Sequence, residues 1–182
     1  MAEQGRRYVA LDFGAESGRT IVGTIADDKL TVEPVHRYPN VPVRMGGTLY
    51  WDFPRMFGDL LDGMRKVSAD GPVHSVSVDT WGVDYGYLDA RGRLIGNPVH
   101  YRDTRHETMP DEAFEVIPRD ELYMATGIQH MSINTIFQML SEVKTNDPIL
   151  GQADRFLMMP DLFNHFLCGV DVCEYTEATT GQ

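Results

Sequence analysis

The N-terminal part of the chain contains three short apolar runs rich in β-branched residues, and polar turns separate them. The runs are Tyr8–Phe13, Arg19–Ala26 and Leu30–Arg37, with Gly14 following the first and Asp27-Asp28 following the second. Runs of this composition predict strands, and consecutive strands joined by short turns usually pair with each other. We therefore expect a three-stranded antiparallel meander in which Asp12 lies near the end of the first strand.

A strongly periodic helix follows the meander. Apolar residues recur at helical spacing, namely Phe53, Met56, Phe57, Leu60, Leu61, Met64 and Val67. Asp52 is placed to cap the start of this helix and Gly71 to end it. The stretch before it, Val41–Asp52, contains Pro42 and Gly46-Gly47, which predicts a loop with at most one short edge strand.

The remaining sequence alternates between strand and helix patterns. We expect strands at His74–Asp79, Tyr85–Asp89 and Phe156–Met159, and a last helix over Leu162–Leu167 that begins at Pro160-Asp161. A second amphipathic helix face is predicted from Ile133, Ile136, Phe137, Leu140 and Val143. This order predicts an α/β fold with a mixed sheet, in which parallel strands follow the meander and helices flank the sheet. A length of 182 residues suits a single compact unit.

The charge balance excludes one class of partner. Lys and Arg number 16 against 27 Asp and Glu, a net charge of −11, so a broad surface for nucleic acid is not expected. A nucleotide can still be held locally by backbone N–H groups, one arginine and a metal ion. The polar start Met1–Arg7 and the break at Asp12 indicate neither a signal peptide nor a membrane span, so we expect a cytoplasmic protein without a membrane partner.

The turn after the first strand carries the groups that phosphate binding requires. It is Asp12-Phe13-Gly14-Ala15-Glu16-Ser17-Gly18-Arg19, with glycines, a hydroxyl, an arginine and a carboxylate. The Asp12 carboxylate and a phosphate are both anions and repel each other. Asp12 is therefore expected to hold a hydrated Mg²⁺ and not to contact a phosphate oxygen directly. The alternative is an ordinary structural turn, because the segment matches neither a Walker loop nor a Rossmann fingerprint.

Two further segments suit a polyhydroxylated ligand. In Ser77–Tyr85, the Trp81 ring, the backbone at Gly82 and the Asp84 carboxylate combine an apolar wall with directional polar groups. Alternatively, Trp81 is a core aromatic and Asp84 a solvated carboxylate at a strand end. Farther on, Arg102 and Asp103 either hydrogen-bond sugar hydroxyls or form a surface ion pair with each other.

These three segments together resemble the FGGY family of carbohydrate kinases, most closely its rhamnulokinase members. The turn after the first strand is similar to the first phosphate motif of the actin-like ATPase and sugar kinase superfamily, in its DxGAxSGR form. Ser77–Tyr85 resembles the IDTWGVD segment, and Pro98–Arg105 resembles the YRDxR segment. The likeness continues to Glu174–Thr180 and so spans nearly the whole chain.

The resemblance implies a ribonuclease H-like (actin-like ATPase) fold, ATP and Mg²⁺ as cofactors, and phosphorylation of a ketose, with L-rhamnulose as the expected substrate and L-rhamnose catabolism as the pathway. The residues that it assigns to ATP are Ala15, Glu16, Ser17, Gly18 and Arg19, with Asp12 holding the metal through water. Those that it assigns to the sugar are Gly82, Trp81, Asp84, Tyr101 and Arg102. Glu16 departs from the pattern, since several relatives have Ser or Thr there.

The resemblance also implies a larger enzyme. FGGY kinases are clamps of two actin-like domains, and residues 1–182 correspond to most of the N-terminal one, with the C-terminal nucleotide-binding domain absent. The family's general base lies in a GxHDxA-type motif, which does not occur up to Gln182. We therefore expect no catalytic residue and little turnover in this chain alone. The rival hypotheses are a kinase for xylulose, fuculose or glycerol, and a non-catalytic sugar-binding module. Oligomeric state is left open.

Overall fold

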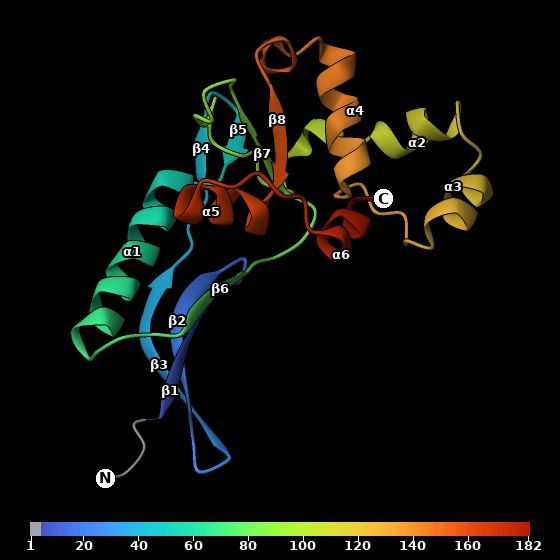
Figure 1. Ribbon diagram of the computed structural model, residues 1–182. Helices are drawn as coiled ribbons and strands as arrows, with labels where there is room; N and C mark the ends of the chain where they lie inside the picture. The colour runs from blue at the N-terminus through green and yellow to red at the C-terminus, as the bar shows by residue number, and fades with distance from the viewer. Residues whose placement is uncertain (1–4) are drawn as a thin grey trace. The chain divides into compact units, whose positions relative to one another are not determined.

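The computed structural model describes residues 5–182 and divides them into two compact units (Figure 1). The first comprises the residues up to Val41 together with Asp52–Trp81, and the second comprises Pro42–Trp51 together with Gly82–Gln182. The expectation of a single compact unit is wrong, because each unit builds its own sheet and core.

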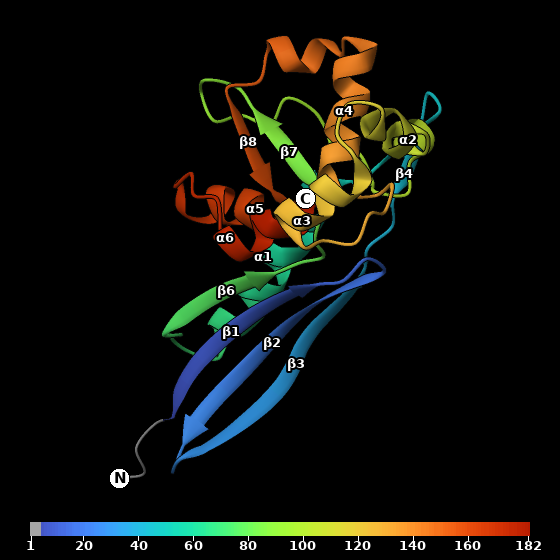
Figure 2. The same ribbon diagram turned by 90° about the vertical axis from the view of Figure 1, so that its right-hand side faces the viewer.

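The first unit is organised around a four-stranded sheet with the order β3-β2-β1-β6 (Figure 2). Its strands are β1 (Arg6–Phe13), β2 (Ser17–Ala26), β3 (Lys29–Pro39) and β6 (Ser75–Asp79). The first three pair antiparallel, which confirms the predicted meander, and β6 runs parallel to β1. This pairing brings the ends of β1 and β6 together, with Asp12 opposite Asp79.

Helix α1 (Phe53–Ala69) packs on β2 and β3 and closes the core of the first unit. Its start is capped as predicted, because the Asp52 carboxylate accepts a hydrogen bond from the Arg55 N–H at 3.3 Å. The helix ends at Ala69, and its C-cap residue Asp70 directly precedes Gly71. Close packing occurs at Gly63, where a Cβ atom would lie 1.9 Å from the Thr20 hydroxyl oxygen.

The second unit contains two antiparallel strand pairs. Strands β4 (Val43–Met45) and β5 (Thr48–Tyr50) form a hairpin where we expected a loop, because Gly46 and Gly47 supply the positive φ angles that a tight turn needs. Strands β7 (Tyr85–Leu88) and β8 (Arg155–Met158) also pair antiparallel, so β6 alone follows the meander in parallel. Within residues 5–182, the expectation of several parallel strands is therefore wrong.

The second unit also contains helices. They are α2 (Met109–Phe114), α3 (Arg119–Thr126), α4 (Thr135–Thr145), α5 (Met159–Cys168) and α6 (Tyr175–Ala178), with short 3-10 turns at Thr104–His106, Pro148–Gly151 and Thr179–Gly181. A buried cluster of Met109, Leu122 and Phe137 joins α2, α3 and α4. The predicted α/β class is confirmed.

The buried face of α4 differs from the predicted one. Val143, expected in the core, is 58% exposed, whereas Gln138, Ser141 and Glu142 are buried. The periodicity of apolar residues could not show this, because Gln138 and Glu142 are buried against hydrogen-bond partners that are distant in the sequence. The last helix was expected to begin at Pro160-Asp161, but α5 begins at Met159, with Met158 as the N-cap residue, and the Asp161 carboxylate accepts a hydrogen bond from the Glu174 N–H.

Across residues 5–182, none of the helices combines the length and the apolar character that crossing a membrane requires.

Candidate functional site

The predicted phosphate hairpin, Asp12–Arg19, connects β1 and β2 in the first unit. The Gly14 N–H donates to the Ser17 carbonyl at 3.0 Å, which leaves Ala15 and Glu16 at the tip. Asn40 holds the tip, because its backbone N–H donates to the Glu16 carbonyl and its side-chain amide donates to the Gly14 carbonyl. The Glu16 side chain is exposed. The hairpin is therefore closed by backbone and Asn40 contacts, while its tip reaches solvent.

Close packing against Tyr38 requires glycine at position 18. A Cβ atom there would lie 2.1 Å from the ring of Tyr38, which pairs with Gly18 across β2 and β3. Burial, together with the carboxylates of Asp59 and Asp12, raises the pKa of Tyr38, so this phenol stays neutral. At Gly14, in contrast, the nearest atom to an added Cβ would be the Ser17 carbonyl oxygen, at 3.3 Å. The two glycines of the hairpin thus differ in how tightly they are enclosed.

Arg19 and Asp12 pair with each other in the hairpin. The Arg19 guanidinium lies 2.6 Å from the Asp12 carboxylate, and the two side chains are 46% and 29% exposed. Asp79 lies next to Asp12 on the neighbouring strand. Both charged groups of the pair thus remain accessible to a ligand: a cation at Asp12 and an anionic oxygen at Arg19.

Metal binding at this hairpin would depend on few protein ligands. In the part of the chain that the structure describes, residues 5–182, no three side chains of His, Cys, Asp or Glu are grouped as a metal site. A single carboxylate such as Asp12 suits Mg²⁺, which usually keeps most of its water ligands. The prediction that Asp12 acts through water stays a prediction.

The segment after β6 contains the predicted sugar residues. Trp81 and Gly82 are both partly buried, and the Thr80 hydroxyl donates to the Trp81 carbonyl. In the second unit, a Cβ atom on Gly82 would lie 3.0 Å from the hydroxyl oxygen of Thr180. Gly82 therefore lies against the C-terminal 3-10 turn, so close packing also favours glycine at this position.

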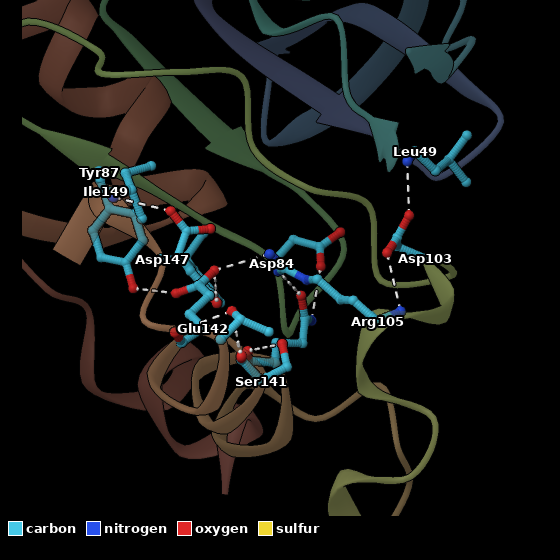
Figure 3. A network of polar contacts seen from close by, with 12 residues as sticks. Leu49, Asp84, Tyr87, Asp103, Arg105, Ser141, Glu142, Asp147 and Ile149 are labelled. Carbon is cyan, nitrogen blue, oxygen red and sulfur yellow. Dashed lines mark hydrogen bonds and ion pairs between the residues drawn. The ribbon is translucent and has the colours of Figure 1, made fainter. Parts of the chain in front are cut away.

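Asp84 is fully buried, and its carboxylate joins three segments of the second unit (Figure 3). One oxygen accepts hydrogen bonds from the Trp51 indole N–H at 2.6 Å and from the Tyr101 N–H at 3.2 Å. The other accepts from the Gln138 amide at 3.0 Å. The alternative of a solvated carboxylate is thus wrong for Asp84. Its carboxylate holds the Tyr101 backbone beside the end of the Gly82 segment.

The Tyr101 segment presents one exposed cation. Arg102 is exposed, and its guanidinium lies over the Tyr101 ring, 5.4 Å from the ring centre. Asp103 is buried and accepts hydrogen bonds from the backbone N–H groups of Leu49 and Arg105 (Figure 3). Asp103 is therefore a structural cap. The alternative of a surface ion pair between Arg102 and Asp103 is wrong, because Asp103 is buried.

Another buried carboxylate, that of Glu142, is linked to Asp84 through Arg105 and Gln138. It accepts hydrogen bonds from the hydroxyls of Tyr85 and Tyr87 at 2.8 and 2.7 Å and from the Arg105 guanidinium at 3.0 Å. Burial is the main cause that raises the pKa of both phenols, so they stay protonated and act as donors. Arg105 also donates to Gln138, which links this group to Asp84.

His100 completes the wall beside Trp51. The two rings stack with centroids 3.9 Å apart, and the His100 Nδ1 atom accepts a hydrogen bond from the Arg102 N–H. Burial, with a smaller contribution from the charge of Arg102, lowers the pKa of His100 to about 4. The imidazole is therefore neutral at physiological pH.

Comparison with known proteins gives the family. The model of the N-terminal domain of the FGGY family of carbohydrate kinases matches residues 7–182. The chain belongs to the FGGY family. It is 39% identical to a rhamnulokinase of Bacteroides thetaiotaomicron over 178 residues, covering 97% of this chain and 37% of that protein. A rhamnulokinase of Oceanobacillus iheyensis is 38% identical over 176 residues, covering 96% of this chain and 37% of that protein. The chain thus spans just over a third of the length of these relatives.

Solved structures share the fold of this FGGY chain. A xylulose kinase from Lactobacillus acidophilus superposes with a TM-score of 0.84 at 14% identity, covering 97% of this chain and 36% of that one. A gluconate kinase from the same organism gives a TM-score of 0.85 at 14% identity, with the same coverage. These likenesses confirm the predicted fold.

Several residues that hold the Gly82–Asp84 segment in place were not identified from the sequence. Trp51 lies in a stretch expected to be a loop, and Thr135 and Gln138 lie on the polar side of a predicted amphipathic helix. A polar helix face usually indicates solvent, so the pattern gave no signal for Gln138. An aromatic residue directly before a helix cap was the available signal for Trp51.

Proposed function

We propose that this chain supplies the sugar-binding part of an ATP-dependent ketose kinase, which converts L-rhamnulose to L-rhamnulose 1-phosphate in L-rhamnose catabolism. The observation that carries the proposal is the 38–39% identity to two rhamnulokinases over 96–97% of the chain. Phosphoryl transfer relies mainly on positioning and on charge stabilisation, so a rigid polar sugar site is the contribution expected from this part of the enzyme.

The proposed sugar site consists of Gly82, Trp81, Asp84, Tyr101 and Arg102. Two features of the second unit support it: Asp84 fixes the Tyr101 backbone beside the Gly82 segment, and the Arg102 guanidinium remains exposed. Asp84 acts by holding this geometry, since its carboxylate accepts hydrogen bonds from three protein donors. Arg102 is then the charged donor available to sugar hydroxyls.

The proposed phosphate site is the hairpin with Ala15, Glu16, Ser17, Gly18 and Arg19, and Asp12 is the proposed water-mediated Mg²⁺ ligand. The donor chemistry fits, since Arg19 offers an accessible guanidinium and Asp12 an accessible carboxylate, each now the partner of the other. ATP supplies the phosphoryl group, and Mg²⁺ neutralises part of its charge. Within this chain, the residues orient the phosphates and hold the metal, and no residue is proposed as the general base.

The proposal includes a partner domain and a compartment. Because the chain spans just over a third of its curated relatives, we propose that a C-terminal nucleotide-binding domain completes the clamp and supplies the base. Residues 1–182 on their own are then expected to show little turnover, because a half-clamp neither excludes water nor aligns the acceptor hydroxyl. ATP is an intracellular metabolite, so the reaction is proposed for the cytoplasm.

A coupled ADP-release assay on the natural protein tests the proposal. L-rhamnulose is expected to give the highest kcat/KM in a panel with D-xylulose, L-fuculose and glycerol. A preference for another member of the panel would retain a sugar kinase and refute the substrate. Sugar binding by calorimetry without any ADP release would refute the enzyme and favour a sugar-binding module.

A further inference from the structure

Val83 has an unusual backbone conformation within the candidate sugar site. Its φ angle is +72°, in the left-handed region. For a β-branched residue this is an outlier, because its Cβ substituents crowd the backbone there. Conformations of this kind persist where the surrounding structure enforces them, and they cluster at functional sites.

Two side chains of α4 donate to the carbonyl oxygen of Val83. The Thr135 hydroxyl lies 2.7 Å from this oxygen, and the Gln138 amide nitrogen lies 3.2 Å from it. Thr135 is 6% exposed and Gln138 is fully buried, so solvent competes little for either bond. The orientation of the Val83 peptide group is thus set from the first turn of α4.

Gln138 is itself held in place. Its amide nitrogen also lies 2.9 Å from the Ile133 carbonyl and 3.0 Å from the Asp84 carboxylate, and its amide oxygen accepts from Arg105 at 3.3 Å. The nitrogen carries two N–H groups, so its three acceptors share them, and the contact with Val83 is the longest of the three. Gln138 therefore fixes two successive residues, Val83 and Asp84. These partners fix the orientation of the Gln138 side chain. The fixed side chain in turn restricts the backbone of Val83 and the side chain of Asp84.

We propose that Thr135 and Gln138 are positioning residues for sugar binding: they hold Val83 in its left-handed conformation and so orient the Gly82 backbone toward the sugar. Neither residue touches the ligand. This inference rests on the proposed function, since it assumes that the Gly82 segment binds a sugar. It adds residues of α4 that lie outside all three segments recognised in the sequence.

A pair of matched threonine variants separates positioning from helix stability. Thr135→Val removes the hydroxyl that bonds Val83, and Thr145→Val removes a hydroxyl that bonds the Ser141 carbonyl at 2.8 Å, farther along the same helix. Loss of one buried hydrogen bond is expected to weaken L-rhamnulose binding by the natural protein roughly threefold to tenfold for Thr135→Val. Thr145→Val is expected to leave the Kd within about twofold. Thr135→Ser, which keeps the hydroxyl, is expected to restore the affinity.

Relief of the strain at Val83 provides a second measurement. Glycine adopts a positive φ without a Cβ penalty, so Val83→Gly lowers the need for an enforcing contact. In a Val83→Gly background, Thr135→Val is expected to change the sugar Kd by less than in the parent, whereas a purely stabilising hydroxyl would give the same loss in both backgrounds. Val83→Asn, which also tolerates the left-handed region, repeats the comparison with a side chain present.

Calorimetry with L-rhamnulose on these variants and on the parent gives distinct outcomes. If the parent binds and Thr135→Val weakens binding more than Thr145→Val, with relief in the Val83→Gly background, the inference holds. If the parent binds and the two threonine variants behave alike, the inference is wrong and the proposed function stands. If the parent binds no member of the sugar panel, the proposed function fails and this inference fails with it.

Discussion

The predicted phosphate hairpin, Asp12–Arg19, and the Gly82–Asp84 segment differ in where they carry their charged groups. The hairpin carries its charges at the surface, where Arg19 and Asp12 are 46% and 29% exposed. Asp84 is fully buried, and the Glu142 side chain beside its network is 5% exposed. Exposed pairs contribute little to stability and are free to exchange partners, whereas buried groups without partners are costly.

This difference separates two kinds of candidate site. In the hairpin, the groups that would meet a ligand are also the groups that are free to move. In the second unit, Asp84 holds the Tyr101 backbone, Glu142 holds the side chains of Tyr85, Tyr87 and Arg105, and Arg102 is exposed. We therefore expect mutations in the two regions to affect stability very differently.

The largest effect is expected for Glu142→Ala. The substitution leaves the Arg105 guanidinium and the hydroxyls of Tyr85 and Tyr87 without their shared acceptor, which should lower the free energy of unfolding of the second unit by about 3 kcal/mol. Urea denaturation followed by Trp51 fluorescence in a Trp81→Phe background measures it.

The matched control for that substitution is Glu112→Ala. Glu112 pairs with Lys144 at 2.8 Å, but both side chains are well exposed, at 38% and 53%. A much smaller loss than that of Glu142→Ala is expected. Equal losses for the two glutamates would contradict the contrast between buried and exposed charges.

The next effect concerns the two hairpin glycines. Gly18→Ala places a methyl group against the Tyr38 ring and should destabilise the first unit by about 2 kcal/mol. Gly14→Ala meets only the Ser17 carbonyl at 3.3 Å and should cost clearly less. Amide hydrogen exchange in β2 and β3 reports the difference. A tolerated Gly18→Ala would show that Tyr38 does not require glycine there.

A smaller effect should appear as a pH dependence of the second unit. The pKa of His100 is lowered to about 4 in the folded state, below its ordinary value of 6.5. The unfolded chain therefore binds this proton first, so the stability from this histidine is fully present above about pH 6.5 and is lost progressively as the pH drops toward 4.

A phenylalanine variant isolates the contribution of His100. His100→Phe keeps a ring against Trp51 and removes the titration, so its unfolding free energy should change less between pH 6.5 and 4. His74→Gln, a change at an exposed histidine of the first unit, should leave the profile of the second unit as it is. An unchanged slope in His100→Phe would assign the pH dependence to other groups.

The smallest change in stability is expected for Arg19→Ala. Its pair with Asp12 is exposed, so the unfolding free energy of the first unit should fall by less than about 1 kcal/mol. The KM for ATP of the natural protein should nevertheless rise, because a charge-assisted contact to phosphate is lost. A large loss of stability with an unchanged KM would make the hairpin arginine structural.

Local patterns were sufficient to predict most of the first unit. The strands β1 to β3 and α1 follow from β-branched runs and from apolar spacing within one segment, and Asp52 caps α1 as expected. These elements depend on contacts between neighbours in sequence, which composition and period describe well.

The second unit was predicted less well, because distant contacts decide it. The hairpin β4–β5 is short and lies beside the Pro98–His100 strand-like segment, which its own sequence does not reveal. The buried side chains of Gln138 and Glu142 form hydrogen bonds with Asp84, Tyr85 and Tyr87, which lie more than fifty residues earlier in the chain.

Hydrogen exchange with mass spectrometry on the natural protein, with and without L-rhamnulose, tests the central claim most directly. The account predicts ligand-induced protection in peptides that contain Gly82–Asp84 and Tyr101-Arg102. Protection confined to other parts of the protein, with these two segments unchanged while calorimetry shows that the sugar is bound, would contradict it.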